Sequence, residues 1–132
     1  MAEDAPIDAD LLPVIQETQQ LLGALITKPK LADKYLAKPP FRFLLDVFKA
    51  CVDQSGFPAG LLSPDLLSKA ESKDASVATR EIKVAVLERV IHCVAHAVDA
   101  EPVADPAKIL KGTDAGNTNL FLQDLARAST FA

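Results

Sequence analysis

Apolar residues recur at intervals of three and four residues in four stretches of the chain, a spacing typical of helices with one buried side. It predicts four longer helices, at about residues 9–27, 40–54, 79–99 and 117–129. The clearest stripe follows Pro39 and Pro40 and consists of Phe41, Leu44, Leu45, Phe48, Cys51 and Val52. No stretch of useful length alternates apolar and polar residues as a strand does. The pattern therefore predicts an all-α fold.

Capping residues predict shorter helical pieces between the longer helices. Residues 31–36 have room for one or two turns. Ser63 is a favourable N-cap, which predicts a short helix over residues 63–69. A further short helix is predicted between Asp105 as N-cap and Gly112, which would end it.

The ends of the first and last long helices are predicted from the same signals. Asp8 or Asp10 is a suitable N-cap for the first helix, which should end near Thr27. Either Asn117 or Thr118 is expected to begin the last helix. The four longer helices and their uneven connections together favour an irregular orthogonal bundle.

Residues 80–99 carry two neighbouring apolar stripes and are expected to form the centre of that bundle, because so wide an apolar arc needs packing on more than one side. The stripes consist of Val84, Leu87, Ile91, Val94 and Val98, and of Val86, Val90, Cys93 and Ala97. Phe57 is expected to insert into the core from its loop. The last helix should point four side chains inward: Leu120, Phe121, Leu122 and Leu125.

The length of 132 residues suits one domain, which we place at residues 9–129, with a flexible N-terminus at 1–8 and a tail at 130–132. Hydrophobic residues make up 49% of the chain and charged residues 24%, which excludes a disordered chain. Charged residues and histidines interrupt the apolar stretch 84–98, so we expect no membrane insertion. The acidic start is unlike a signal peptide, which favours the cytoplasm.

Residue pairs that could support catalysis or metal binding are few. His92 and His96 stand four apart, but no Glu follows the first and no third ligand is evident, so we expect no metal site. Cys51 and Cys93 occupy apolar positions of predicted helices, where a free thiol behaves as a small hydrophobic group. A disulfide between them stays open as an alternative. We expect neither an enzyme nor a cofactor.

Nucleic-acid binding is not expected either. Single-strand binding surfaces interleave basic and aromatic residues. The chain has no Trp, and Tyr35 is its one Tyr.

Positive charge is concentrated in one part of a chain whose formal net charge is −4. Residues 1–27 carry five acids and no base, whereas residues 28–49 carry six bases and two acids. Lys30, Lys34 and Lys38 are spaced four apart, so a helix here would align them on one face. The alternative is an ordinary solvated helix face with no role in binding.

Two acids offset part of the positive charge of residues 28–49. Asp33 is the local counter-charge of the lysines, and Asp46, one turn after Arg42, can neutralise the arginine. A partner feels the local patch more than the net charge, because salt screens charges beyond about 8 Å.

Residues 35–47, read with Ser55-Gly56-Phe57 and Gly60-Leu61, resemble the N-terminal calponin-homology domains of the intraflagellar transport protein 54 family, also called microtubule-interacting proteins associated with a TNF-receptor-associated factor. The similarity is weaker but collinear over residues 105–112 and 118–120, and spans about residues 11–127. Two segments depart from the family pattern: residues 113–117, and the longer connection at 71–79.

The resemblance implies a calponin-homology domain that binds tubulin or microtubules. It implies a subunit of intraflagellar transport complex B that acts in ciliary assembly and anterograde transport, located in the cilium or flagellum, the basal body, the cytoplasm and the cytoskeleton. Other complex B subunits would join through a C-terminal linker and coiled coil, which the family carries and this chain lacks. The isolated domain is expected to be a monomer.

The resemblance and the charge pattern together suggest a basic surface that contacts the acidic tails of tubulin. Its expected residues are Lys28, Lys30, Lys34, Lys38 and Arg42, with Lys108 and Lys111 brought alongside by the fold. Reversing Lys30 and Lys34 to Glu is expected to abolish binding without loss of thermal stability. The competing hypothesis is a protein-docking module that holds another transport subunit or a motor through an apolar groove, and actin binding comes third.

Overall fold

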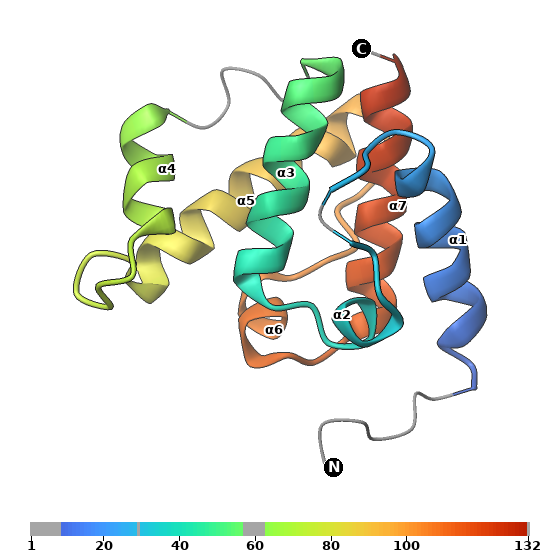
Figure 1. The fold of residues 1–132 in the computed structure, drawn as a ribbon, viewed down its shortest axis with the longest axis horizontal. Helices are drawn as coiled ribbons and strands as arrows, with labels where there is room; N and C mark the ends of the chain where they lie inside the picture. The colour runs from blue at the N-terminus through green and yellow to red at the C-terminus, as the bar shows by residue number, and fades with distance from the viewer. Residues whose placement is uncertain (1–8, 29, 57–62, 132) are drawn as a thin grey trace.

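The computed structural model describes residues 9–28, 30–56 and 63–131. In this part of the chain there are seven helices and no strand, which confirms the all-α prediction (Figure 1). The helices are α1 (Leu12–Gly23), α2 (Asp33–Ala37), α3 (Phe41–Ser55), α4 (Pro64–Glu71), α5 (Arg80–Ala97), α6 (Pro106–Lys111) and α7 (Ala115–Phe131).

Side-chain caps fix several helix starts as predicted. The Ser63 Oγ accepts a hydrogen bond from the Leu66 N–H at 3.1 Å, and the Asp105 Oδ2 accepts one from the Lys108 N–H at 3.3 Å. These bonds satisfy amide groups that have no partner inside the first turn. Gly112 ends α6 with a φ of +74°, a left-handed conformation that suits glycine.

Three predicted helix ends are wrong. The N-cap of α1 is Leu11 rather than Asp10, and α1 ends at Gly23 instead of continuing to residue 27. The last helix begins two residues before Asn117, because the Asp114 carbonyl already accepts from the Thr118 N–H at 3.1 Å. Asp8, the alternative N-cap of the first helix, and Phe57, which we expect to insert into the core, lie outside the described residues.

The centre of the bundle is α7, not the helix over residues 80–99. Figure 1 shows α1 alongside α7, and α7 also contacts α2, α3 and α5. α5 instead contacts α4, α6 and α7, and its buried residues form one band: Val86, Leu87, Val90, Ile91, Val94 and Ala95. The expected second stripe was wrong in part, since Ala97 is exposed and Cys93 is half-buried.

Most of the expected inward side chains are buried. Phe121, Leu122 and Leu125 of α7 are at most 2% exposed, whereas Leu120 is 40% exposed, contrary to prediction. Phe48 of α3 packs edge-on against Phe121 at 5.9 Å between ring centroids. The α3 stripe proved wider than predicted, because it also buries Phe43 and Val47.

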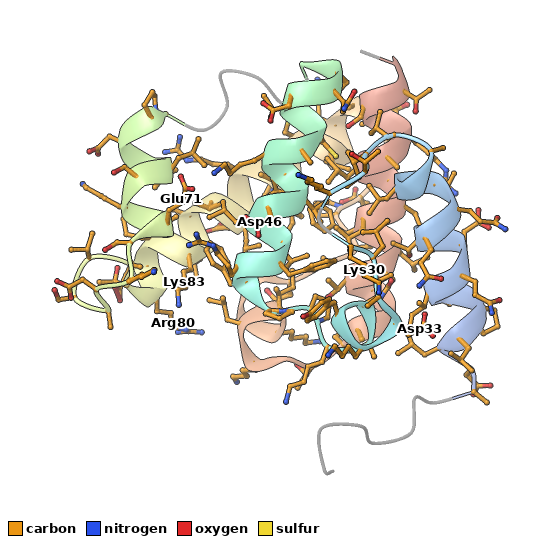
Figure 2. The ribbon with its side chains drawn as sticks, viewed as in Figure 1. Lys30, Asp33, Asp46, Glu71, Arg80 and Lys83 are labelled. Carbon is orange, nitrogen blue, oxygen red and sulfur yellow. The ribbon has the colours of Figure 1, made fainter. Side chains whose placement is uncertain are left out.

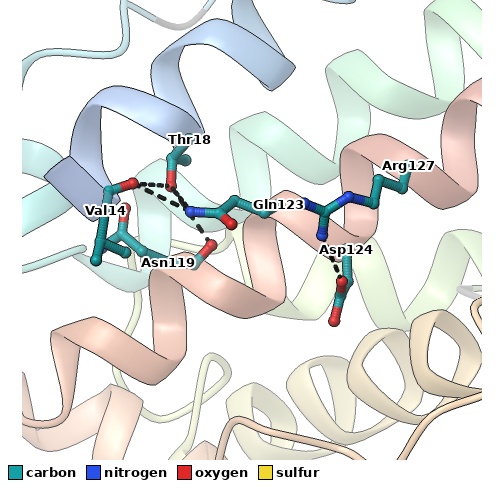
Figure 3. A network of polar contacts seen from close by, with 6 residues as sticks. All are labelled: Val14, Thr18, Asn119, Gln123, Asp124 and Arg127. Carbon is teal, nitrogen blue, oxygen red and sulfur yellow. Dashed lines mark hydrogen bonds and ion pairs between the residues drawn. The ribbon is translucent and has the colours of Figure 1, made fainter.

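Buried polar bonds join α1 to α7 (Figure 3). The Gln123 Nε2 donates to the Val14 carbonyl at 3.1 Å and to the Thr18 Oγ1 at 3.2 Å. The Thr18 hydroxyl in turn donates to the Val14 carbonyl at 3.0 Å. Since an unpaired buried polar group is costly, these bonds fix how α1 sits on α7.

The same side of the bundle anchors α2. The Asn119 Nδ2 donates to the Leu36 carbonyl at 2.8 Å, and the Gln19 Nε2 donates to the Leu31 carbonyl at 2.8 Å. Leu36 is fully buried. We call residues 28–38 the basic segment. Side chains of α1 and α7 thus hold its backbone at Leu31 and Leu36.

Candidate functional site

All seven basic residues predicted to form the site are exposed. The expectation that Lys30, Lys34 and Lys38 share one helical face was wrong, because α2 covers only Asp33–Ala37. Lys30 precedes the helix, and Lys38 is its C-cap with a φ of −149° and a ψ of +78°. Their side chains therefore leave the backbone from three different conformations.

Lys28 lies in mixed surroundings. It lines a shallow depression of about 260 Å³ together with Lys49, Ala50 and two acids, Asp46 and Asp53. The two carboxylates offset the two ammonium groups, so this part of the surface carries little net charge.

Lys34 lies over an aromatic side chain. Its Nζ is 5.3 Å from the centroid of the Tyr35 ring, and that ring stacks on Phe43 at 5.5 Å. Asp33, the expected counter-charge, accepts a hydrogen bond from the Gln19 Nε2 at 2.7 Å. Asp33 thus serves to hold α2 against α1.

Lys38 is the member of the segment that reaches α6. A Cβ added at Gly112 would lie 2.5 Å from the Lys38 Cε, so the lysine side chain runs directly over this glycine. Gly112 immediately follows Lys111 in the chain. The fold therefore brings Lys38 and the end of α6 together, while Lys108 lies one turn earlier on α6.

Arg42, at the start of α3, contacts the end of α4. Its Nη1 donates to the Glu71 carbonyl at 3.1 Å, while its Nε lies 4.0 Å from the Asp46 Oδ1. The Arg42 and Asp46 side chains are 58% and 45% exposed, so their ion pair contributes little. The predicted neutralisation of Arg42 is therefore weak.

Three cations that sequence reasoning did not single out lie near Arg42 and Lys111. A depression of about 620 Å³ is lined by Phe41, Arg42, Ala70, Ser72, Lys73, Ala75, Ala78 and Lys83. A second one, of about 470 Å³, is lined by Arg80, Lys83, Leu110 and Lys111. Lys83 lines both, so the two depressions adjoin. We call Arg42, Lys73, Arg80, Lys83 and Lys111 the basic face.

Lys83 occupies the centre of the basic face. Its Nζ lies 5.7 Å from the centroid of the Phe41 ring, which positions the ammonium between α3 and α5. Figure 2 shows Lys83 and Arg80 together at the start of α5, below Glu71 of α4, with Lys30 on the other side of α3.

The basic face escaped sequence analysis because its residues come from distant positions. Around Lys73, Arg80 and Lys83 the chain also carries Glu71, Asp74 and Glu81, which makes this stretch look neutral. The available signal was the three-residue spacing of Arg80 and Lys83, which places both on one side of a helix.

The histidines and cysteines, which could support metal binding or catalysis, belong to no cluster of metal ligands and no disulfide in the described part of the chain. His92 and His96 are exposed, and the described residues contain no group of three or more His, Cys, Asp or Glu side chains that could hold a metal ion. Neither described cysteine forms a disulfide. Burial raises the pKa of the Cys51 thiol to about 11, with the nearby Ser129 hydroxyl acting in the opposite direction. Such a thiol is a poor nucleophile at neutral pH.

Among the helices of the described part, none combines the length and the apolar character needed to cross a membrane.

Comparison with known proteins identifies the family. The family described as the CH-like domain of microtubule-binding protein MIP-T3 matches residues 14–131. TRAF3-interacting protein 1 of Danio rerio is 39% identical over 115 residues, which cover 86% of this chain and 17% of that protein. The Mus musculus protein of the same name is 37% identical over 111 residues, or 83% of this chain and 17% of that protein.

The chain thus spans only about one sixth of the length of these relatives. The family match nevertheless covers all seven helices except the first two residues of α1. The chain therefore belongs to the MIP-T3 family of calponin-homology-like domains.

Proposed function

We propose that this domain binds tubulin or microtubules through its positively charged surface. The observation that carries the proposal is the convergence of cations from α3, α5 and α6 on the basic face, in a chain with a net charge of −4. The acidic tails of tubulin are complementary to such a surface. The family description, which names a microtubule-binding protein, supports the same partner.

The seven expected residues differ in how close they lie to the basic face. Arg42 and Lys111 belong to the basic face, and Lys38 lies beside it over Gly112. We propose that these three make close contacts with tubulin. The remaining four, which are Lys28, Lys30, Lys34 and Lys108, add positive potential from neighbouring surface.

The expected affinity of one domain is low. An exposed charge pair contributes about 0–1 kcal/mol, so five cations supply a few kcal/mol, which is less than the 8.2 kcal/mol of micromolar binding. Binding should therefore weaken strongly with salt. Several copies along a transport train would raise the overall affinity through multivalency.

We further propose the cellular setting that the resemblance implies. The domain would belong to a subunit of intraflagellar transport complex B, acting in ciliary assembly and anterograde transport at the cilium, basal body and cytoskeleton. Other complex B subunits would bind through a C-terminal coiled coil outside this chain.

The test is binding of this chain to αβ-tubulin, intact or with its acidic tails removed, at low and at physiological salt. The proposal predicts binding at low salt that falls when either the tails are removed or salt is added. Binding that ignores both changes would instead favour the docking module with an apolar groove. An absence of binding would reject the tubulin proposal.

The apolar-groove alternative has less support from the described part of the chain. An apolar groove needs several exposed hydrophobic side chains close together. The large exposed hydrophobic side chains of the described residues come from four separate segments and are each about two-fifths exposed: Tyr35, Val77, Val103 and Leu120. We therefore keep this alternative as an outcome of the test.

A further inference from the structure

We propose that the two depressions meeting at Lys83 form one groove that binds an extended, glutamate-rich peptide. This inference rests on the proposed function and makes it more specific, because a tubulin tail is a peptide of this kind. It assigns the contact to α3, α5, α6 and the loop after α4, including three residues outside the predicted site: Lys73, Arg80 and Lys83.

The groove carries cations along its length. Arg42 and Lys73 line one depression, Arg80 and Lys111 line the other, and Lys83 lies where the two adjoin. An extended peptide advances about 3.3 Å per residue and turns alternate side chains to the same side. Successive carboxylates on one side of such a peptide can therefore meet successive cations.

Two acids beside the groove, Glu71 and Asp74, are already engaged within the domain. The Glu71 carboxylate pairs with the Lys49 Nζ at 2.6 Å. The Asp74 carboxylate accepts from the Ser76 N–H at 2.9 Å and from its hydroxyl at 2.7 Å.

Arg42 is the one cation of the groove that has an acidic partner, Asp46 at 4.0 Å, whereas the other four have no carboxylate partner among the described residues. These four are Lys73, Arg80, Lys83 and Lys111. A partner that supplies carboxylates to them would therefore add new pairs without breaking existing ones.

The position of Arg80 and Lys83 adds to this argument. Both lie at the start of α5, where the helix dipole disfavours positive charge, and their spacing of three makes them repel each other. Glu81 in the same turn offsets part of this cost. An acidic ligand would relieve the remaining repulsion.

A peptide suits the groove better than a nucleic acid does. Single-stranded nucleic acids bind by stacking bases on exposed aromatic rings. The one aromatic ring lining the described groove is Phe41, which is half-buried and has the Lys83 ammonium over it. The apolar contribution of Phe41 and Leu110 matches the methylene groups of glutamate side chains.

The decisive experiment compares two double charge reversals that change the net charge equally. The probes are a synthetic peptide of ten glutamates and tubulin with intact tails, and binding is measured at low salt. We expect Arg80→Glu with Lys83→Glu to weaken peptide binding at least about tenfold, a factor that corresponds to about 1.4 kcal/mol. The control is Lys30→Glu with Lys34→Glu. The charge pattern along the sequence led us to expect that this change abolishes binding, but a groove at Lys83 predicts that it weakens peptide binding less than about threefold.

A second measurement does not depend on the variants folding. Titration of the unaltered chain with the peptide should shift the backbone amide NMR signals of Arg80, Lys83 and Lys111 more than those of Lys30 and Lys34. Shifts confined to residues 28–38 would overturn the groove. Equal loss of peptide binding in both double variants would overturn it as well.

Further outcomes separate this inference from the proposed function. If tubulin binds but the peptide does not, the groove is rejected and the tubulin proposal stands. If the peptide binds in the groove but tubulin does not, the groove stands as an acidic-peptide site and the tubulin proposal is rejected. Equally tight binding of a single-stranded oligonucleotide of the same charge would overturn the assignment to a peptide.

Discussion

Two regions of this domain gather several positively charged residues, and they are organised in opposite ways. In residues 28–38 the lysines are close in sequence, but Lys28 lies beside two acids, Lys34 over Tyr35 and Lys38 over Gly112. On the basic face the cations are far apart in sequence, yet Lys83 adjoins Arg42 in one depression and Lys111 in the other.

The difference shows that charge density along a chain is a poor guide to charge density on a surface. The backbone of the basic segment is held by the Gln19 and Asn119 side chains, while its lysines follow an irregular path that spreads them. The basic face depends instead on the packing of helices. Each of the following predictions alters one of the two regions, or the contact between them, from the largest expected effect to the smallest.

Asn119→Leu should break the anchor of the basic segment. The substitution removes the donor to the buried Leu36 carbonyl, and a buried acceptor left unpaired costs about 1–3 kcal/mol. Chemical denaturation should show that the free energy of unfolding falls by about 1–3 kcal/mol. Amide hydrogen exchange should quicken at Lys38, whose N–H donates to Lys34 at the end of α2.

The same variant tests whether the two regions are independent. Binding of the ten-glutamate peptide should be unchanged, since the groove is built from α3, α5 and α6 together with the loop after α4. Peptide binding lost in proportion to the loss of α2 order would show that the two regions act as one.

Gly112→Ala should disturb the contact between the two regions. The φ of +74° disfavours alanine by about 1–2 kcal/mol, and the new Cβ would displace the Lys38 side chain. Thermal unfolding should detect the loss. Gly23→Ala is the matched control, because nothing lies within 4 Å of a Cβ there and alanine favours the helix by roughly 0.5–1 kcal/mol. Equal destabilisation by both substitutions would contradict the assigned roles.

Neutralising the start of α5 should stabilise the domain while it weakens binding. Arg80→Gln removes a cation from the positive end of a helix, which should raise the free energy of unfolding by about 0.3–1 kcal/mol at low salt. Lys83→Gln should raise it less, because it also removes the ammonium contact with the Phe41 ring. Denaturation at low and high salt should show a gain that salt diminishes. A loss of stability in both variants would mean that these cations support the fold.

Glu71→Gln should have the smallest effect. It removes an exposed ion pair with Lys49, worth about 0–1 kcal/mol, and leaves intact the backbone carbonyl that accepts from Arg42. One less negative charge beside the groove should strengthen binding of the ten-glutamate peptide up to about twofold. Weaker peptide binding would contradict the view that Glu71 is a nearby opposing charge.

The sequence alone determined the local structure of this domain. Its apolar spacing identified the four long helices, and Ser63, Asp105 and Gly112 marked ends of the short ones, because caps and helical stripes depend on residues three or four apart. The predictions were weakest at helix ends that a backbone hydrogen bond sets. The start of α7 is an example, because the Asp114 carbonyl accepts from the Thr118 N–H.

Only the tertiary structure decided which helix is central and which cations meet. Helix α7 became the centre because α1, α2, α3 and α5 all pack on it, although residues 80–99 carry the wider apolar arc. The basic face requires residues 42, 83 and 111 to converge, which depends on how separate helices pack against one another. Such convergence is a property of the whole core, so no local pattern could reveal it.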